Sequence, residues 1–147
     1  MAKEDVDLIR SLVPPHEIDW AAVIRDDESA QQLEVASQPA FAPEFRSGLL
    51  GITETWGSGF EGLRAIWLEW LEPWETYRVR EERIEDLGDG RVVWLGRDYG
   101  TSADGSGEIA LVSSAIWTVT DGKVAEVVFY TDRARCLRDA GLEKTTP

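Results

Sequence analysis

The chain has 147 residues, a length that predicts a single domain covering residues 1–147. Its 28 acidic and 15 basic residues give a formal net charge of −13, which disfavours nucleic acids and anionic membrane surfaces as partners. The one cysteine, Cys136, rules out an intrachain disulfide and a multi-cysteine zinc site. The sequence shows neither a membrane-spanning apolar run nor the apolar core of a signal peptide, so we expect a cytoplasmic protein.

The first part of the chain predicts helices. Apolar residues at helical spacing predict one helix over residues 5–13 and a second over residues 18–24. A third helix is expected to begin at Ser29, as its N-cap, and to end near Ala36.

The next segment is less regular until a tryptophan-rich helix begins. Residues 39–43 begin and end with proline and predict a loop. Residues 45–56 fit neither a helix nor a strand, because Gly48 and Gly51 interrupt them. Residues 60–74 predict the clearest helix, since their apolar side chains form one stripe at helical spacing: Leu63, Ile66, Trp67, Trp70 and Trp74.

The second half of the chain predicts a β-sheet. Four runs of β-forming residues follow one another, over about 76–86, 91–99, 108–119 and 123–131. Turns rich in Asp and Gly separate the runs, which predicts an antiparallel meander of long, twisted strands. A short last helix is expected between Asp132, its N-cap, and Gly141. Helices followed by strands indicate the α+β class.

The third predicted strand is apolar on both faces. Leu111 and Trp117 share one face, and Val112 and Ile116 share the other. A sheet that is apolar on both faces must be covered on both. We expect the chain's own helices to cover one face and a second copy of the chain to cover the other, which predicts a homodimer joined through the sheet face.

Three segments together resemble a known family. They are the glycine-rich start of the tryptophan helix at residues 59–64, the strand–turn–strand at residues 115–124, and residues 127–132, which lead into the last helix. The chain resembles a SnoaL-like member of the nuclear transport factor 2-like superfamily. This resemblance implies a cone-shaped α+β barrel, in which a curved antiparallel sheet wraps around N-terminal helices and leaves an apolar pocket at its open end. It also implies a homodimer joined through the sheet.

The acid–base residues of enzymes in this superfamily are missing from the matching positions. The resemblance places Ala115 and Phe129 where relatives carry acids, and neither side chain transfers a proton. Glu54 is the carboxylate nearest to the position of the relatives' general base. Epoxide hydrolases of this superfamily carry an Arg-x-Asp pair on the second long strand, whereas Arg97 and Asp98 are adjacent here, point to opposite faces and cannot both enter the pocket without a bulge.

The remaining pocket candidates are mostly aromatic, and large flat side chains suit a small apolar or polycyclic ligand. The expected ligand-binding residues are Trp56, Trp67, Tyr77, Trp94, Ala115, Trp117 and Phe129. The sequence shows no residue spacing typical of a metal site, and no cofactor is expected.

We therefore favour a small-molecule-binding protein that holds its ligand without transforming it. The alternative is an isomerase, lyase or cyclase in which Glu54 or Asp98 takes a proton from a carbon next to a carbonyl and Tyr99 polarises the oxygen. In a third interpretation, side chains fill the cavity and only the dimer matters. The sequence leaves open whether the protein is an enzyme.

Overall fold

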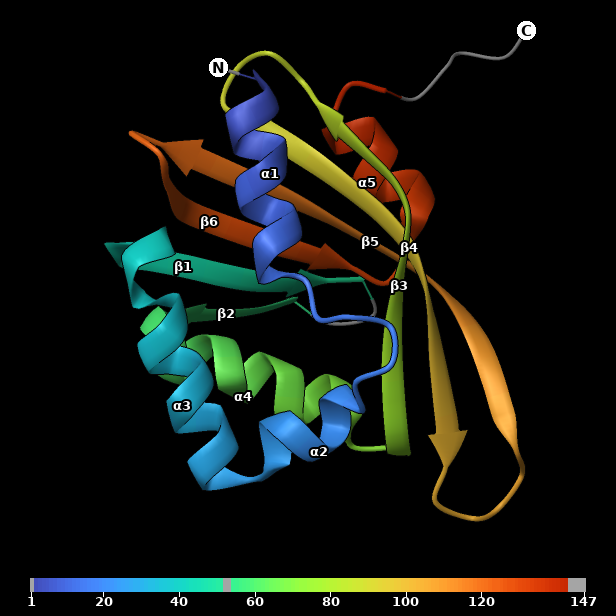
Figure 1. The fold of residues 1–147 in the computed structure, drawn as a ribbon. Helices are drawn as coiled ribbons and strands as arrows, with labels where there is room; N and C mark the ends of the chain where they lie inside the picture. Colours follow the sequence, from blue (N-terminus) through green and yellow to red (C-terminus); the bar gives the residue numbers. More distant parts are fainter. Residues whose placement is uncertain (1, 52–53, 143–147) are drawn as a thin grey trace, which may run out of the picture.

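The computed structural model describes residues 2–51 and 54–142 and shows one curved sheet with helices on both of its faces (Figure 1). The elements in chain order are α1 (Ala2–Leu12), α2 (Trp20–Arg25), α3 (Asp27–Ser37), the 3-10 helix η1 (Gln38–Ala40), β1 (Phe41–Leu50), β2 (Glu54–Ser58), α4 (Gly59–Leu71), β3 (Trp74–Asp86), β4 (Arg91–Ser102), β5 (Glu108–Thr120), β6 (Lys123–Tyr130) and α5 (Arg133–Asp139). None of the helices in this described part has the length and hydrophobicity that a membrane crossing requires.

The strand order is β2-β1-β6-β5-β4-β3, so the sheet is open, with β2 at one edge and β3 at the other. Neighbouring strands are antiparallel, except that β1 and β6 are parallel. The helices α1 to α4 pack on the concave face and α5 packs on the convex face (Figure 1). This arrangement confirms the predicted cone-shaped α+β fold, including the meander of four long strands from β3 to β6.

The segment from residue 39 to residue 56, for which the sequence predicts no regular element, contributes to two further strands, β1 and β2. The predicted loop over residues 39–43 is wrong beyond Ala40, because β1 begins at Phe41. Gly48 does not break β1. It makes room for a ring, since a Cβ there would lie 2.6 Å from Cζ3 of Trp56. Residues 52–53, within the ambiguous stretch, lie outside the described residues.

Two helix boundaries also differ from the prediction. Ser29 is not the N-cap of α3. Asp26 has that role, because its carboxylate accepts hydrogen bonds from the backbone N–H of Ser29 at 2.9 Å and from the Ser29 hydroxyl at 2.7 Å. The tryptophan helix ends at Leu71, and Trp74 begins β3. Helical spacing alone could not reveal this, because Trp74 packs into the same core from a strand.

The sheet is packed on both faces, as its composition predicts. The concave face contributes to the main core, together with α1, α2 and α4. On the convex face, Cys136 of α5 and Ala140, the C-cap of that helix, pack in one core cluster with Val93, Ile116 and Val128. The chain therefore covers part of the convex face itself. Ile109 and Val112 on β5 remain exposed. The homodimer joined through the sheet face stays a prediction.

Candidate functional site

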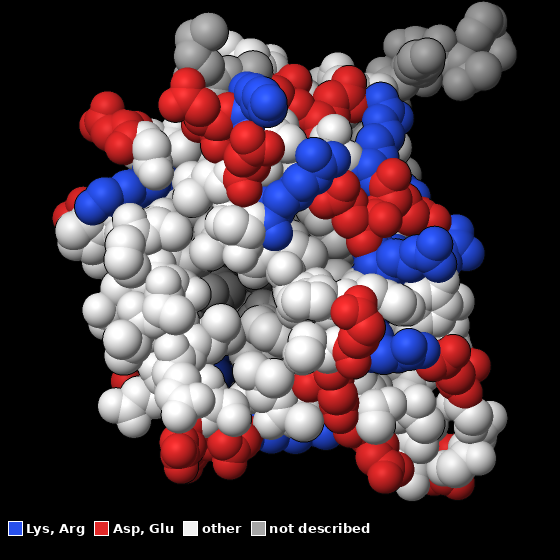
Figure 2. Space-filling view, viewed as in Figure 1, with Lys and Arg blue, Asp and Glu red and all other residues white. Residues whose placement is uncertain are grey.

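A cavity of about 670 Å³ lies between the concave face of the sheet and the helices α1 to α4. Figure 2 shows a hollow in this face of the molecule, and the atoms around it belong mostly to uncharged residues. The end of α1, the length of α3 and one side of α4 form the helical wall, and β4, β5 and β6 form the opposite wall. The space is large enough for a small organic molecule.

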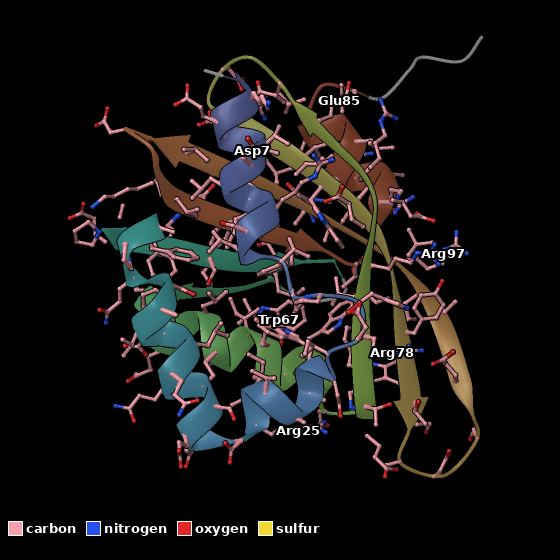
Figure 3. All side chains as sticks on the ribbon, viewed as in Figure 1. Asp7, Arg25, Trp67, Arg78, Glu85 and Arg97 are labelled. Atoms are coloured by element: carbon pink, nitrogen blue, oxygen red, sulfur yellow. The ribbon has the colours of Figure 1, made fainter. Side chains whose placement is uncertain are left out.

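Aromatic rings make up much of the wall. Five of the expected ligand-binding residues line the cavity: Trp67, Trp94, Ala115, Trp117 and Phe129. The Phe129 ring is 5.2 Å from that of Trp67 and 6.3 Å from that of Trp117, and both contacts are edge-to-face. Figure 3 shows Trp67 reaching from α4 into the interior. The strand register brings these residues together, because Trp94, Ala115 and Phe129 stand opposite one another in β4, β5 and β6.

A carboxylate is buried in this wall. Asp98 on β4 lines the cavity and is 3% exposed. The Tyr77 hydroxyl donates to its Oδ2 at 2.5 Å, and the Ser113 hydroxyl donates to its Oδ1 at 2.8 Å. The indole N–H of Trp70 donates to the Tyr77 oxygen at 2.6 Å, which extends the network into α4. These partners are uncharged, so the carboxylate is held by hydroxyl groups rather than by a cation.

The strand register explains why these groups meet. Tyr77 on β3 and Ser113 on β5 lie two residues along from the direct partners of Asp98, which are Val79 and Leu111. All of these side chains are on the concave face because strand residues alternate.

Two glycines next to Asp98 allow tryptophan rings to cover this stretch of β4. A Cβ on Gly96 would lie 2.1 Å from the Trp94 ring, and a Cβ on Gly100 would lie 2.4 Å from the Trp74 ring. Gly96 and Gly100 stand two residues before and after Asp98, on the same face of β4. The rings can approach the backbone this closely only because these positions have no side chain.

Burial controls the protonation of the network. Loss of water raises the pKa of Asp98 from the ordinary aspartate range to about 6, although the hydrogen bonds from Tyr77 and Ser113 oppose the shift. Burial, and then the nearby Asp98 charge, also raises the pKa of the Tyr77 hydroxyl, which stays protonated. Near neutral pH the site therefore combines an ionised but unusually basic carboxylate with a neutral phenol.

The convex face supports the backbone behind this network. Arg133 of α5 donates to the carbonyl oxygens of Gly96, at 2.7 Å, and Ser113, at 3.0 Å. These two residues are direct partners in the β4–β5 register. The shift in the β3–β4 register between Glu81 and Arg83 lies opposite Gly96. Arg133 thus joins two strands immediately behind the residues that flank and bind Asp98.

Other residues predicted for the site lie elsewhere. Glu54 on β2 has a side chain that is 63% exposed and lies 3.5 Å from Arg135, outside the cavity. Tyr99 follows Asp98 on the strand and faces away from it, with its ring 5.6 Å from that of His16. Trp56 is 44% exposed and packs under the Arg46 guanidinium. Tyr77 is fully buried and does not line the cavity, but its hydroxyl donates a hydrogen bond to Asp98.

Ser113 is a site residue that the sequence analysis missed, although alternation along β5 could have located it. Ser113 shares the strand face of Ala115 and Trp117, so it lies on the cavity side of β5. Trp70 was expected only as a core residue, and nothing in the sequence pairs it with Tyr77. In the described residues no group of three or more metal-binding side chains comes together.

Comparisons of the structure place this chain among cone-shaped α+β proteins with the nuclear transport factor 2-like fold. A protein described as a SnoaL-like polyketide cyclase from Jannaschia sp. CCS1 is 18% identical, with a TM-score of 0.64 over 99% of this chain and 95% of that one. An NTF2-like protein of unknown function from Burkholderia pseudomallei K96243 is 15% identical, with a TM-score of 0.63 over 92% of this chain and 95% of that one. TerC, co-crystallised with polyporic acid, is 16% identical, with a TM-score of 0.63 over 94% of this chain and 98% of that one.

The sequence adds no closer assignment. No protein-family model matches it, and no curated protein matches it either. Similarity at these levels of identity establishes the fold and leaves the activity to be argued from the site.

Proposed function

We propose that this protein is an isomerase, lyase or cyclase in which Asp98 moves a proton on a flat, apolar carbonyl compound bound in the cavity. The observation that carries the proposal is the buried Asp98 carboxylate in the cavity wall, held by the hydroxyls of Tyr77 and Ser113. The sequence favoured binding without chemistry because Ala115 and Phe129 cannot transfer protons. A carboxylate on the neighbouring strand removes that objection.

The environment of Asp98 suits a general base. A carboxylate with a pKa of about 6 is mostly ionised at pH 7 and is a stronger base than a solvated one. It would take a proton from a carbon next to the carbonyl and return it to another atom of the same molecule. The apolar, aromatic wall excludes competing water and strengthens electrostatic interactions at the reacting atoms.

The carbonyl oxygen needs a donor as negative charge develops on it. The indole N–H groups of Trp94 and Trp117 are buried, belong to residues of the cavity wall and have no hydrogen-bond partner within the described residues. Each N–H is covered by neighbouring atoms, so either group would stabilise the oxygen of a bound carbonyl compound only after a shift of its ring exposes it to the cavity. Tyr99, expected from the sequence to have this role, is not retained in the proposal because it faces away from Asp98.

Binding alone is the second candidate, and the aromatic wall favours it. Flat rings in the wall would hold a polycyclic molecule whether or not a reaction follows. TerC, which has the same fold, was co-crystallised with a small molecule, and this supports a ligand inside the cone. The two candidates differ in what Asp98 does.

The test uses 2-tetralone, a flat bicyclic ketone, with the full chain. Binding is followed by quenching of tryptophan fluorescence, and proton transfer by exchange of the α-hydrogens for deuterium, measured by NMR in D2O. We expect binding and catalysed exchange, and we expect Asp98→Asn to bind 2-tetralone but to lose about 10²–10⁴-fold in exchange rate. The exposed Glu44→Gln is the matched control and should exchange at the wild-type rate.

Each other outcome counts against part of the proposal. Exchange that survives Asp98→Asn but is lost in Glu54→Gln would move the base to Glu54 and overturn the assignment. Binding of 2-tetralone without catalysed exchange would reduce the protein to a binding module. No binding would mean that side chains fill the cavity or close it to ketones of this size. Circular dichroism of each variant confirms that a loss of exchange is not a loss of fold.

A further inference from the structure

We infer that the cavity selects uncharged flat molecules and rejects anionic ones of the same shape. The inference rests on the proposed function in one respect, which is that the cavity admits a ligand. It does not depend on Asp98 catalysing a reaction. It follows from the charged residues among those that line the cavity.

The charges in the lining are mostly negative. The acids are Asp27 and Glu34 from α3, Glu61 from α4, and Asp98 from β4. Among the described residues that line this cavity, Arg64 is the single basic one. The chain as a whole has a formal net charge of −13, so the surrounding field has the same sign.

Arg64 is already engaged by the protein. Its Nη2 lies 2.8 Å from Oδ1 of Asp27 and 3.3 Å from the carbonyl oxygen of Arg25, and its Nε donates to the carbonyl oxygen of Ile24 at 2.9 Å. These contacts join α2, α3 and α4. An anionic ligand would have to break them to obtain a positively charged partner, and the acids Glu34 and Glu61 would remain.

The buried interior of the cavity disfavours anionic ligands more strongly than the charged lining residues do. An anion that reaches the aromatic wall leaves water, and it approaches the ionised Asp98 carboxylate in a region of low dielectric constant. The indole N–H groups of Trp94 and Trp117 are neutral, so they provide no formal positive charge to offset this cost. An uncharged molecule with one or two acceptor oxygens meets none of these penalties.

Two fluorescent probes differ in the relevant charge. N-phenyl-1-naphthylamine is uncharged, and 8-anilinonaphthalene-1-sulfonate has the same ring system with a sulfonate. Both are titrated into the full chain at pH 8 and low ionic strength, with 2-tetralone as competitor to show that they occupy the cavity. We expect the uncharged probe to bind at least about tenfold more tightly, as repulsion by several carboxylates implies.

Variants separate charge from hydrophobicity. Glu34→Gln combined with Glu61→Gln removes two lining charges, and we expect it to tighten binding of the sulfonate about fivefold at low salt, with binding of the uncharged probe unchanged. Glu44→Gln combined with Glu75→Gln is the matched control. It removes two exposed acids that do not line the cavity, and it should change the binding of neither probe beyond twofold.

The outcomes distinguish this inference from the proposed function. Equal affinity for the two probes, or no response of sulfonate binding to the Glu34/Glu61 pair, would overturn the charge selection and leave the role of Asp98 untouched. Failure of both probes and of 2-tetralone to bind would overturn both, because the cavity would then be closed. Charge selection with no proton exchange would retain this inference and overturn the enzymatic proposal.

Discussion

The two faces of the sheet provide opposite environments for a carboxylate. On the concave face, Asp98 is buried and receives hydrogen bonds from the neutral Tyr77 and Ser113. On the convex face, Glu82 is exposed to water and lies 3.2 Å from Arg97 and 3.5 Å from Arg133. Arg97 precedes Asp98 in the chain, and Figure 3 shows it pointing outward from the sheet.

The contrast between Glu82 and Asp98 shows how the surroundings of a carboxylate set its basicity. Glu82 lies beside two arginines at the surface, where water and salt screen the ion pairs. Asp98 receives its hydrogen bonds from neutral hydroxyls and is 3% exposed, so its ionised form is costly and burial raises its pKa to about 6. The convex site can stabilise the fold only slightly, whereas the concave site gives its carboxylate the raised pKa that the proposed proton transfer requires. Four predictions test this contrast, from the largest expected effect to the smallest.

The largest effect is on the pH dependence of stability. Asp98 binds its proton more tightly in the folded chain than in the unfolded chain, where its pKa is about 4. The folded state is therefore favoured at low pH, and this advantage disappears as the pH rises through about 6. We expect Asp98 to cost about 3 kcal/mol of unfolding free energy above pH 7 relative to pH 3. Urea denaturation from pH 3 to pH 8 measures it.

The comparison with Asp98→Asn isolates this contribution. Hydrogen bonds hold the pKa of the exposed Asp26, Asp89 and Asp104 below the ordinary range, so these residues favour folding as the pH rises. Their effect is present in both proteins and cancels in the difference. A difference between wild type and Asp98→Asn that stays constant with pH would show that Asp98 titrates normally.

The second prediction concerns the rings that cover the strand beside Asp98. Gly96→Ala would place a Cβ against the Trp94 ring and within 2.6 Å of the Arg80 carbonyl oxygen, so the ring or the backbone must move. We expect a loss of about 2 kcal/mol in unfolding free energy from overpacking. If the displaced ring admits water to Asp98, the pKa of that carboxylate should fall, which NMR titration would detect. The glycine of the exposed turn, Gly105, is a poor control because its φ is +79°.

A better control is an alanine substitution that leaves the wall intact. Ser37→Ala at the end of α3 removes a small polar group from the far side of the cavity lining. It should leave the pKa of Asp98 unchanged and cost less than about 0.5 kcal/mol. An Asp98 pKa that is the same in Gly96→Ala as in wild type would show that the Trp94 ring does not control the desolvation.

The third prediction concerns the residue that connects the two faces. Arg133→Met keeps the apolar stem but removes the donors to the carbonyl oxygens of Gly96 and Ser113. Lost hydrogen bonds from a charged donor predict a decrease of about 1–2 kcal/mol in unfolding free energy. Thermal denaturation measures this, and Arg97→Met on the same face should cost less. Equal effects of the two variants would mean that the backbone contacts of Arg133 contribute nothing.

The comparison also shows what the sequence could reveal. The four long strands, their turns and the last helix follow from local patterns, because alternation and Asp-Gly turns act over a few residues. The N-cap role of Asp132 is confirmed, since its carboxylate accepts from the Ala134 N–H at 3.0 Å. Gly141 has a positive φ of +77° at the end of α5, as expected for its position.

The site itself needed information that local patterns lack. Alternation shows that Asp98 and Tyr99 face opposite ways, but it does not say which of them enters the cavity. That choice is made when Tyr77 and Ser113, which are distant in sequence, meet Asp98 across two strand pairs. Trp56 and Glu54 were expected near the pocket, yet β2 is an edge strand and leaves both of them exposed.

The smallest effect should come from the convex carboxylate. Glu82→Gln removes an exposed negative charge that lies beside Arg97 and Arg133, and exposed ion pairs contribute about 0–1 kcal/mol. We expect a loss below about 0.5 kcal/mol that disappears in 0.5 M salt, because screening has already weakened the pair. Denaturation at low and high salt measures it. Removing the Asp98 charge should instead stabilise the fold above pH 6. Glu82→Gln and Asp98→Asn are therefore expected to change the unfolding free energy in opposite directions. A change in the same direction would show that the two faces provide similar environments for a carboxylate.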